Sequence, residues 1–191
     1  PVLYNDDVII PAQVRKGAAL EDARDYFVVG CVEVHLPNAD VRPMAGGIDI
    51  IECLELALND GRCMITGEQL GPKTGDPAGF KSFDELMEAY KGQISHATRL
   101  QVAETVKLQL SEPGKFPVPF LSATIDDCMA KGLDITEGGA RYNATSPCIT
   151  GIACVADSLA AVKRLVFEER RVSMGELVEA LRSNFEGREE L

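Results

Sequence analysis

The chain has 191 residues, a formal net charge of -11 and 46% hydrophobic residues. This length suits one domain with a substantial core. The acidic balance argues against a nucleic-acid partner, because such a partner requires a basic surface that displaces counterions from phosphates. No apolar run approaches the roughly 20 residues that span a bilayer, and no leader with a cleavage site is visible. We therefore expect a cytoplasmic protein without a membrane partner.

Six cysteines and two histidines are the residues that could form disulfides or bind a metal. The cysteine spacing fits no compact secreted disulfide framework, which favours free thiols. There is no C-x-x-C pair, and a Cys/His zinc site would have to be assembled from scattered residues. We expect no metal site.

The first elements in chain order are a short strand, a turn at Asn5–Asp7 and a short helix over Leu20–Tyr26. Residues 26–37, "YFVVGCVEVHLP", predict one β-strand. Since residues two positions apart share a face of a strand, Cys31 and Glu33 are expected to point together. The following residues 36–47, rich in Pro and Gly, predict a loop.

The middle of the chain predicts two helices. Apolar residues at helical spacing predict a buried helix from residue 48 that ends near Asn59–Gly61. Residues 66–81 form a turn-rich loop. Ser82 and Glu85 form a capping box, which opens a long helix that runs to about Leu110.

The last third predicts three more helices. Residues 121–131 predict a helix that is stopped by Gly132, and residues 134–152 predict a loop. Asp157 is expected to cap a helix over residues 158–170. Ser173 and Glu176 form a second capping box ahead of a final helix.

The candidate site begins with Cys31 and Glu33. A cysteine in an apolar run is most often a small buried hydrophobe. A carboxylate there costs several kcal/mol unless it is paired or faces a cavity, so Glu33 either lines a pocket or lies on an exposed strand tip. A buried carboxylate would suit proton transfer. His35 is expected to lie roughly 13 Å from Cys31 along the strand, too far for a Cys-His nucleophile pair.

The loop sequence "EGGARYN" supplies two further candidates. Glu137 and Asn143 flank Gly138-Gly139, where the backbone can approach a ligand closely, so either side chain lines a substrate pocket or caps the loop. The loop lacks the Lys and Ser/Thr of a phosphate-binding P-loop, so nucleotide binding is weakly supported.

Several segments together carry a resemblance to a known family. They are "DARDYFVVGCVEV", "LELALNDGRC", "TGEQLGPKTGDP", "FKSFDELMEAY", "PVPFLSATIDDCMAKG", "DITEGGARYN" and "VADSLAAVKRLVFEERRVSMGELVEALRSNFEG". In this order they resemble the second half of the pyruvate formate-lyase-like glycyl radical enzymes. The resemblance implies an α/β fold, here a mainly helical fragment of a ten-stranded barrel.

The resemblance also implies a mechanism and its partners. By position, "GCVE" is similar to the family's cysteine finger, so Cys31 would form a thiyl radical and Glu33 would act as acid/base in the lyase, dehydratase and decarboxylase branches. The substrate would be small and polar. The intact enzyme would store a glycyl radical, require an activating enzyme with S-adenosylmethionine and an iron-sulfur cluster, and form a homodimer.

The sequence departs from the family pattern in several respects, and these departures limit which branch of the family it resembles. Cys31 has no adjacent second cysteine, which sets the chain apart from pyruvate formate-lyase itself, and Val34 stands where dehydratases usually have Pro. Residues 1–191 would be a partial barrel domain that lacks the N-terminal half and the glycyl radical segment. Alone, the chain is expected to be inactive and poorly folded. The alternative is a non-catalytic piece that serves as a folding or assembly module.

Overall fold

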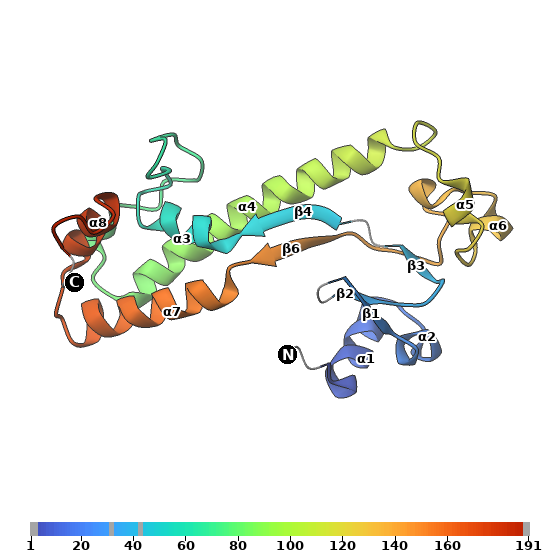
Figure 1. Ribbon diagram of the computed structural model, residues 1–191, viewed down its shortest axis with the longest axis horizontal. Helices are drawn as coiled ribbons and strands as arrows, with labels where there is room; N and C mark the ends of the chain where they lie inside the picture. The colour runs from blue at the N-terminus through green and yellow to red at the C-terminus, as the bar shows by residue number, and fades with distance from the viewer. Residues whose placement is uncertain (1–3, 31–32, 42–43, 189–191) are drawn as a thin grey trace. The chain divides into compact units, whose positions relative to one another are not determined.

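The computed structural model describes residues 4–30, 33–41 and 44–188, which fall into two compact units (Figure 1). The hairpin unit comprises Pro1–Ala45 and Glu104–Ser146, and the helical unit comprises Gly46–Ala103 and Pro147–Leu191. The elements are α1 (Asp6–Arg15), α2 (Leu20–Arg24), β1 (Phe27–Val29), β2 (Glu33–His35), β3 (Asp40–Val41), β4 (Met44–Asp49), α3 (Ile50–Ala57), η1 (Pro77–Gly79), α4 (Phe83–Ser111), α5 (Pro119–Ser122), α6 (Cys128–Lys131), η2 (Ile135–Glu137), β5 (Tyr142–Asn143), β6 (Ser146–Thr150), α7 (Ile152–Val162), η3 (Lys163–Glu168) and α8 (Met174–Arg182). Helices dominate, as the sequence predicts.

The hairpin unit is built from two small strand pairs and short helices. Strands β1 and β2 form an antiparallel hairpin, and β3 pairs in parallel with β5. Its buried core is small: Ala18, Ala23, Leu36 and Ala39, with Ile10, Tyr26 and Tyr142 packed against them. Because most of the buried residues are alanines, little apolar area is buried here. Hydrogen bonds and ion pairs therefore contribute much of the stabilisation of this unit.

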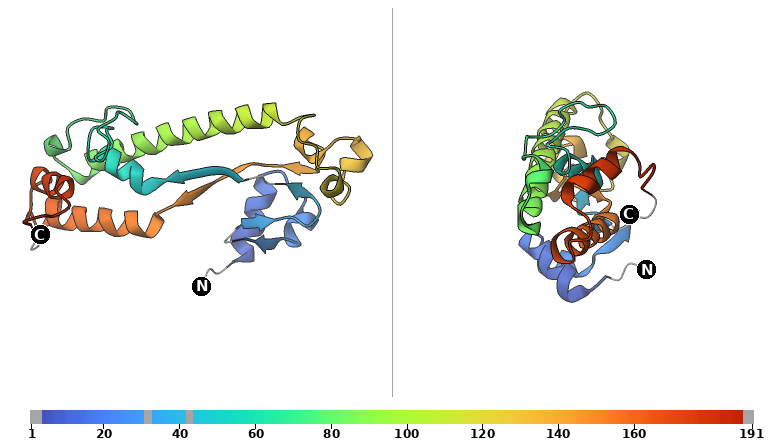
Figure 2. Two further views of the ribbon diagram at one scale, coloured as in Figure 1. Left: turned by 45° about the horizontal axis from the view of Figure 1, so that its top comes forward. Right: turned by 90° about the vertical axis from the view of Figure 1, so that its left-hand side faces the viewer.

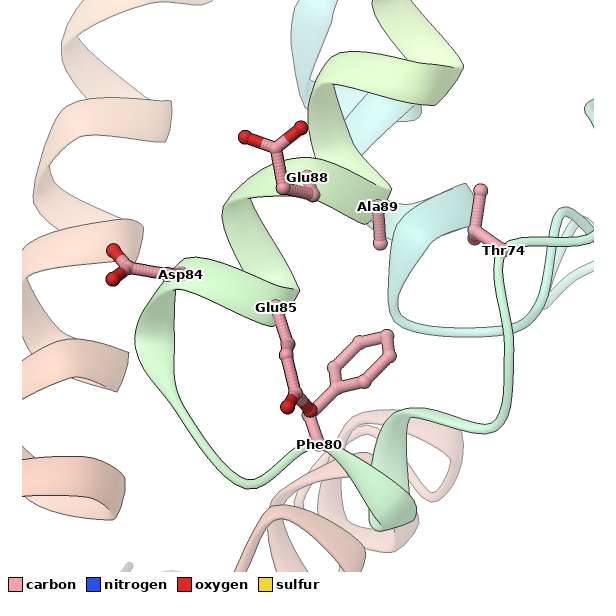
Figure 3. A pocket seen from close by; sticks show the side chains of 6 residues that line it. All are labelled: Thr74, Phe80, Asp84, Glu85, Glu88 and Ala89. Atoms are coloured by element: carbon pink, nitrogen blue, oxygen red, sulfur yellow. The ribbon is translucent and has the colours of Figure 1, made fainter.

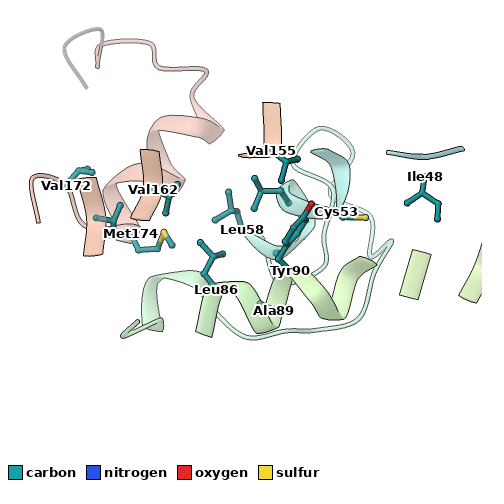
Figure 4. Packing of buried hydrophobic residues seen from close by; sticks show 13 residues of the cluster. Ile48, Cys53, Leu58, Leu86, Ala89, Tyr90, Val155, Val162, Val172 and Met174 are labelled. Atoms are coloured by element: carbon teal, nitrogen blue, oxygen red, sulfur yellow. The ribbon is translucent and has the colours of Figure 1, made fainter. Parts of the chain in front are cut away.

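The helical unit has a larger core. Leu58 of the segment after α3, Leu86 of α4, Val162 of α7 and Met174 of α8 converge in it (Figure 4). Helix α7 continues into the wider helical turn η3 without a break in the ribbon (Figure 2). Strands β4 and β6 hydrogen-bond to each other. The predicted helix at residue 48 is confirmed as α3.

Local capping explains where the main helices begin. The carboxylate of Asp49 accepts a hydrogen bond from Ile51 N at 2.8 Å, which satisfies a first-turn amide of α3. Ser173 and Glu176 cap each other's amides at the start of α8, so this capping box is confirmed. At α4, Ser82 Oγ accepts from Glu85 N at 3.3 Å, while Glu85 reaches back to Lys81 N at 2.8 Å. In a standard capping box the Glu85 carboxylate would instead accept from Ser82 N, one residue later in the chain.

Three predicted elements in the first 50 residues are wrong. Asn5 does not lie in a turn; its side chain accepts from Asp7 N at 2.9 Å and caps α1, a helix that the sequence reading missed. Residues 26–37 form a hairpin rather than one strand. The predicted loop over 36–47 contains β3 and the start of β4, because their strand partners lie far away in the sequence.

Two predicted helices in the last third differ from the structure. The helix expected over residues 121–131 is two short helices, α5 and α6, and Gly132 does end the second one with a φ of +64°. Helix α7 begins at Ile152 after Gly151, so Asp157 lies inside the helix and does not cap it.

Candidate functional site

The candidate site is centred on the β1–β2 hairpin. Phe27 pairs with His35, Val28 with Val34 and Val29 with Glu33. The sequence between the paired ends is Gly30-Cys31-Val32, of which Cys31 and Val32 lie outside the described residues. The chain reverses direction between Val29 and Glu33, so the single strand predicted over residues 26–37 is wrong, whereas the prediction that Cys31 and Glu33 point together lies outside the described residues. The functional roles of Cys31 and Glu33 stay predictions.

Gly30 keeps the turn open for the carboxylate of Glu33. Its φ of +61° lies in the left-handed region that glycine adopts without strain. A Cβ placed on Gly30 would lie 2.7 Å from Glu33 Oε2, so the carboxylate lies close to the backbone of Gly30. The sequence reading missed Gly30. The signal was present, since a lone glycine inside an apolar run indicates a turn, bulge or close approach.

The base of the hairpin is fixed by His35. Its Nδ1 lies 3.0 Å from Oδ1 of Asp40, whose side chain is fully buried, while the His35 side chain is 18% exposed. The imidazole also packs against Phe27 on the opposite strand, with ring centroids 6.1 Å apart. These contacts tie the open end of the hairpin to β3.

The loop that supplies the other two candidates is organised by Asp134. Its carboxylate accepts hydrogen bonds from Thr136 N and Oγ1, Ser122 Oγ and Val118 N, at 2.8 to 3.0 Å. The bond from Thr136 N is the largest cause that lowers the pKa of Asp134, to about 2. Burial of the carboxylate opposes this shift. Asp134 therefore stays ionised in the folded chain.

Glu137 and Asn143 make local bonds in this loop. Glu137 Oε2 accepts from Asp134 N at 3.2 Å, and Asn143 Nδ2 donates to Ala140 O at 2.9 Å and Gly138 O at 3.2 Å. These contacts are the ones expected if Glu137 and Asn143 cap the loop, which is the alternative to lining a substrate pocket. Their role in substrate binding stays a prediction.

Asn143 also lines a cavity of about 270 Å³ in the hairpin unit. The lining is mostly uncharged and polar or small: Val41, Gln109, Glu112, Ile135, Thr136, Gly138, Asn143, Ala144 and Thr145. Val41 and Asn143 face each other in the β3–β5 pair. Hydroxyl and amide groups around this volume suit a small polar molecule.

A larger cavity, of about 500 Å³, lies in the helical unit at the start of α4 (Figure 3). Three carboxylates line it, but Glu85 caps the helix and Glu88 pairs with Lys91 at 2.7 Å. Asp84 and Glu88 point in different directions (Figure 3). Among the described residues, no group of three or more His, Cys, Asp or Glu side chains is arranged to hold a metal ion.

The described cysteines are free thiols, as expected. Burial raises the pKa of Cys53 and of Cys128, which keeps both thiols protonated and unreactive. These two residues are packing elements of the structure. A thiolate is therefore disfavoured at both positions, so neither residue is a candidate nucleophile.

Comparison with known proteins places this geometry in a family. The pyruvate formate lyase-like family model matches residues 1–191. The chain is 42% identical to the (2S)-3-sulfopropanediol dehydratase of Klebsiella oxytoca, over 100% of this chain and 23% of that protein. It is 39% identical to the isethionate sulfite-lyase of Oleidesulfovibrio alaskensis, over 100% of this chain and 24% of that protein.

Solved structures agree with the sequence matches. The B12-independent glycerol dehydratase from Clostridium butyricum superposes with a TM-score of 0.90 at 38% identity, over 100% of this chain and 24% of that one. A glycyl radical enzyme from Archaeoglobus fulgidus gives a TM-score of 0.86 at 34% identity, over 97% of this chain and 23% of that one. The fold is that of a glycyl radical enzyme barrel. The chain belongs to the pyruvate formate lyase-like family, and its relatives are dehydratases and lyases of that family rather than pyruvate formate-lyase itself.

The matches cover all of this chain but only part of each relative. The chain spans about a quarter of the length of the relatives it matches. The expected fold class, a mainly helical α/β fragment of the barrel, is confirmed. Among residues 4–30, 33–41 and 44–188, no helix is long and apolar enough to cross a membrane.

Proposed function

We propose that this chain supplies the cysteine hairpin of a glycyl radical enzyme that eliminates a leaving group from a small hydroxylated substrate. The observation that carries the proposal is the β1–β2 hairpin, whose turn sequence holds Cys31 between Gly30 and the first residue of the return strand, Glu33. In the proposal the Cys31 sulfur reaches the substrate, and the carboxylate of Glu33, two residues further along the chain, handles a proton of the same substrate.

In this proposal the Cys31 thiyl takes a hydrogen atom from a substrate carbon that carries a hydroxyl group. The S–H bond forms as the C–H bond breaks. The bond from the neighbouring carbon to its leaving group then breaks, and the leaving group departs with the electron pair. Glu33 accepts the hydroxyl proton and passes it to the leaving group. The product radical recovers the hydrogen atom from the Cys31 thiol, so the sequence is redox-neutral overall.

The choice of an elimination rests on the relatives. One is named for dehydration of a sulfopropanediol and another for release of sulfite from isethionate. Hydroxide and sulfite are the corresponding leaving groups, and a protonated Glu33 would supply the proton that converts them to water and bisulfite. Val34, where dehydratases of the family usually have Pro, leaves the particular leaving group open.

The proposal extends to the partners that the family uses. A glycyl radical on a segment outside this chain, formed by a separate enzyme with S-adenosylmethionine and an iron-sulfur cluster, would take the hydrogen atom of the Cys31 thiol, so that a C–H bond forms as the S–H bond breaks. The sequence fits this role because Cys31 lies between the two paired strands and has no adjacent second cysteine. A homodimer and a cytoplasmic location are part of the same proposal. The alternative is a non-catalytic module for folding or assembly.

The test uses the full-length protein encoded by the gene from which the chain comes, activated anaerobically. Cys31→Ser should retain the glycyl radical signal in electron paramagnetic resonance and give no product, because an O–H bond is too strong for the hydrogen-atom transfer. Glu33→Gln should behave in the same way, since an amide cannot accept the proton.

Cys53→Ser is the matched control and should turn over substrate. A wild-type protein with no radical signal and no turnover would support the assembly module instead. Turnover by Cys31→Ser at the wild-type rate would refute the thiyl role.

A further inference from the structure

The segment of residues 141–143 contacts the chain on both sides of the β1–β2 hairpin, here called the cysteine hairpin. On the side that precedes β1, the hydroxyl of Tyr142 accepts a hydrogen bond from Ala19 N at 2.9 Å and donates one to Asp22 Oδ2 at 2.7 Å. Asp22 lies on α2, which leads directly into β1. The chain before the hairpin is thus bound to the side chain of Tyr142.

The chain after the hairpin is bound to the backbone of the same residue. Tyr142 N donates to Ala39 O at 2.9 Å, and Tyr142 pairs with Asp40 in the parallel β3–β5 ladder. Asp40 in turn holds the ring of His35 at the hairpin base. The contacts therefore run from Tyr142 through Asp40 and His35 into the hairpin itself.

Arg141 reinforces the first of these anchors. Its guanidinium lies 3.2 Å from Asp22, 3.0 Å from Asp126 and 3.5 Å from Asp127. Arg141 is 37% exposed, so solvent screens these pairs and each contributes modestly. The Tyr142–Asp22 bond is partly buried and geometrically specific. The hydroxyl of Tyr142 is accordingly the stronger element of the anchor.

We propose that Tyr142 is a positioning residue for the cysteine hairpin, holding both of its ends so that Cys31 and Glu33 reach the same substrate. The catalytic part of this inference rests on the proposed function. The structural part, that Tyr142 restrains the hairpin, does not. Because the small core of this unit offers few large side chains, removal of one hydroxyl that serves two hydrogen bonds should loosen the hairpin without unfolding the unit.

The test compares Tyr142→Phe with Tyr26→Phe in the full-length protein. Tyr26 also lies just before β1, but its hydroxyl donates to Asp6 Oδ1 at 2.7 Å on α1 and not to the 141–143 segment. Both variants lose one tyrosine hydroxyl from the same flank of the hairpin. Asp22→Asn serves as a second test, because it weakens the same anchor from the other side.

Amide hydrogen exchange is the first readout. We expect Tyr142→Phe and Asp22→Asn to speed exchange of the β1 and β2 amides at least tenfold, and Tyr26→Phe to leave them within twofold of wild type. Equal exchange in Tyr142→Phe and wild type would overturn the inference, whether or not the protein catalyses a radical reaction.

Kinetics give the second readout. A displacement of about 1 Å in reacting groups can cost a hundredfold in rate, so kcat of Tyr142→Phe should fall at least tenfold while KM and the yield of glycyl radical stay near wild type. Faster hairpin exchange with unchanged kcat would overturn the positioning role. A wild-type protein without Cys31-dependent turnover would instead refute the proposed function and leave the exchange result to decide the anchor.

Discussion

Substitution of Gly30 by alanine separates two effects of a side chain at the hairpin turn. The first is backbone strain, because an L-residue at a φ of +61° loses roughly 1 kcal/mol relative to glycine. The second is steric. The added Cβ would lie 2.7 Å from Glu33 Oε2, whereas ordinary contact begins at 3.4 Å, so the carboxylate would have to retreat by the difference, about 0.7 Å. Gly30→Ala should therefore displace the proposed proton-transfer group.

The matched control is Gly67→Ala. Gly67 has a φ of +74°, and a Cβ there would meet nothing within 4 Å, so this variant carries the strain without the displacement. A retreat of about 0.7 Å predicts a fall in kcat of roughly tenfold to a hundredfold for Gly30→Ala, and no change for Gly67→Ala. Steady-state turnover of the full-length protein gives the rates, and denaturant unfolding gives the stability of each variant.

Both variants should lose a similar, small amount of stability, since both place alanine at a positive φ. Wild-type turnover by Gly30→Ala would show that the carboxylate position above the turn has no bearing on the reaction. Equal losses of turnover in both variants would attribute the effect to stability and refute the steric reasoning.

Two further predictions concern stability. The carboxylate of Asp134 has a pKa of about 2 in the fold and 3.8 as the reference value, so its stabilisation is complete above about pH 4 and is lost as the pH falls towards 2. Amide exchange of Thr136 should show a loss of about 1 to 2 kcal/mol across that window in wild type and no such step in Asp134→Asn, whereas a step in the variant would contradict the assignment. Gly71→Ala should destabilise the helical unit by roughly 3 kcal/mol, because its Cβ would lie 1.9 Å from Oε1 of the buried Gln93. Gly79→Ala, whose Cβ would meet nothing within 4 Å, is the control, and similar unfolding midpoints for the two alanine variants would refute this packing argument.

Helix starts that depend on a cap within three residues could be predicted from the sequence. Ser173 and Glu176 are one example, and the helix that begins after Ser82 is another. The same local reasoning failed at Asn5, because an asparagine beside two aspartates fits both a turn and an N-cap. Only the length of the helix that follows distinguishes the two readings.

The candidate site was harder to predict because its geometry depends on distant partners. The apolar run around Cys31 is compatible with one long strand, and Gly30 is its sole turn signal. Strand β3 was read as loop because its partner β5 lies about 100 residues further along the chain, beyond the reach of any local pattern. The sequence pattern singled out Cys31 and Glu33 as site residues and the family resemblance supplied their roles, whereas the place of Glu33 on the return strand of a hairpin came from the structure.

The bond between Ala19 and Tyr142 has a consequence for the order of folding. It joins residues 123 positions apart. Closing a chain segment of that length costs about 4 kcal/mol of entropy, so the hairpin gains its anchor only after many shorter-range contacts have formed. On a ribosome that adds 5 to 20 residues per second, about 6 to 25 seconds separate synthesis of Ala19 from synthesis of Tyr142. During that interval residues 27–35 are already made, but the restraint that Tyr142 provides does not yet exist, so the anchor of the hairpin forms late in folding.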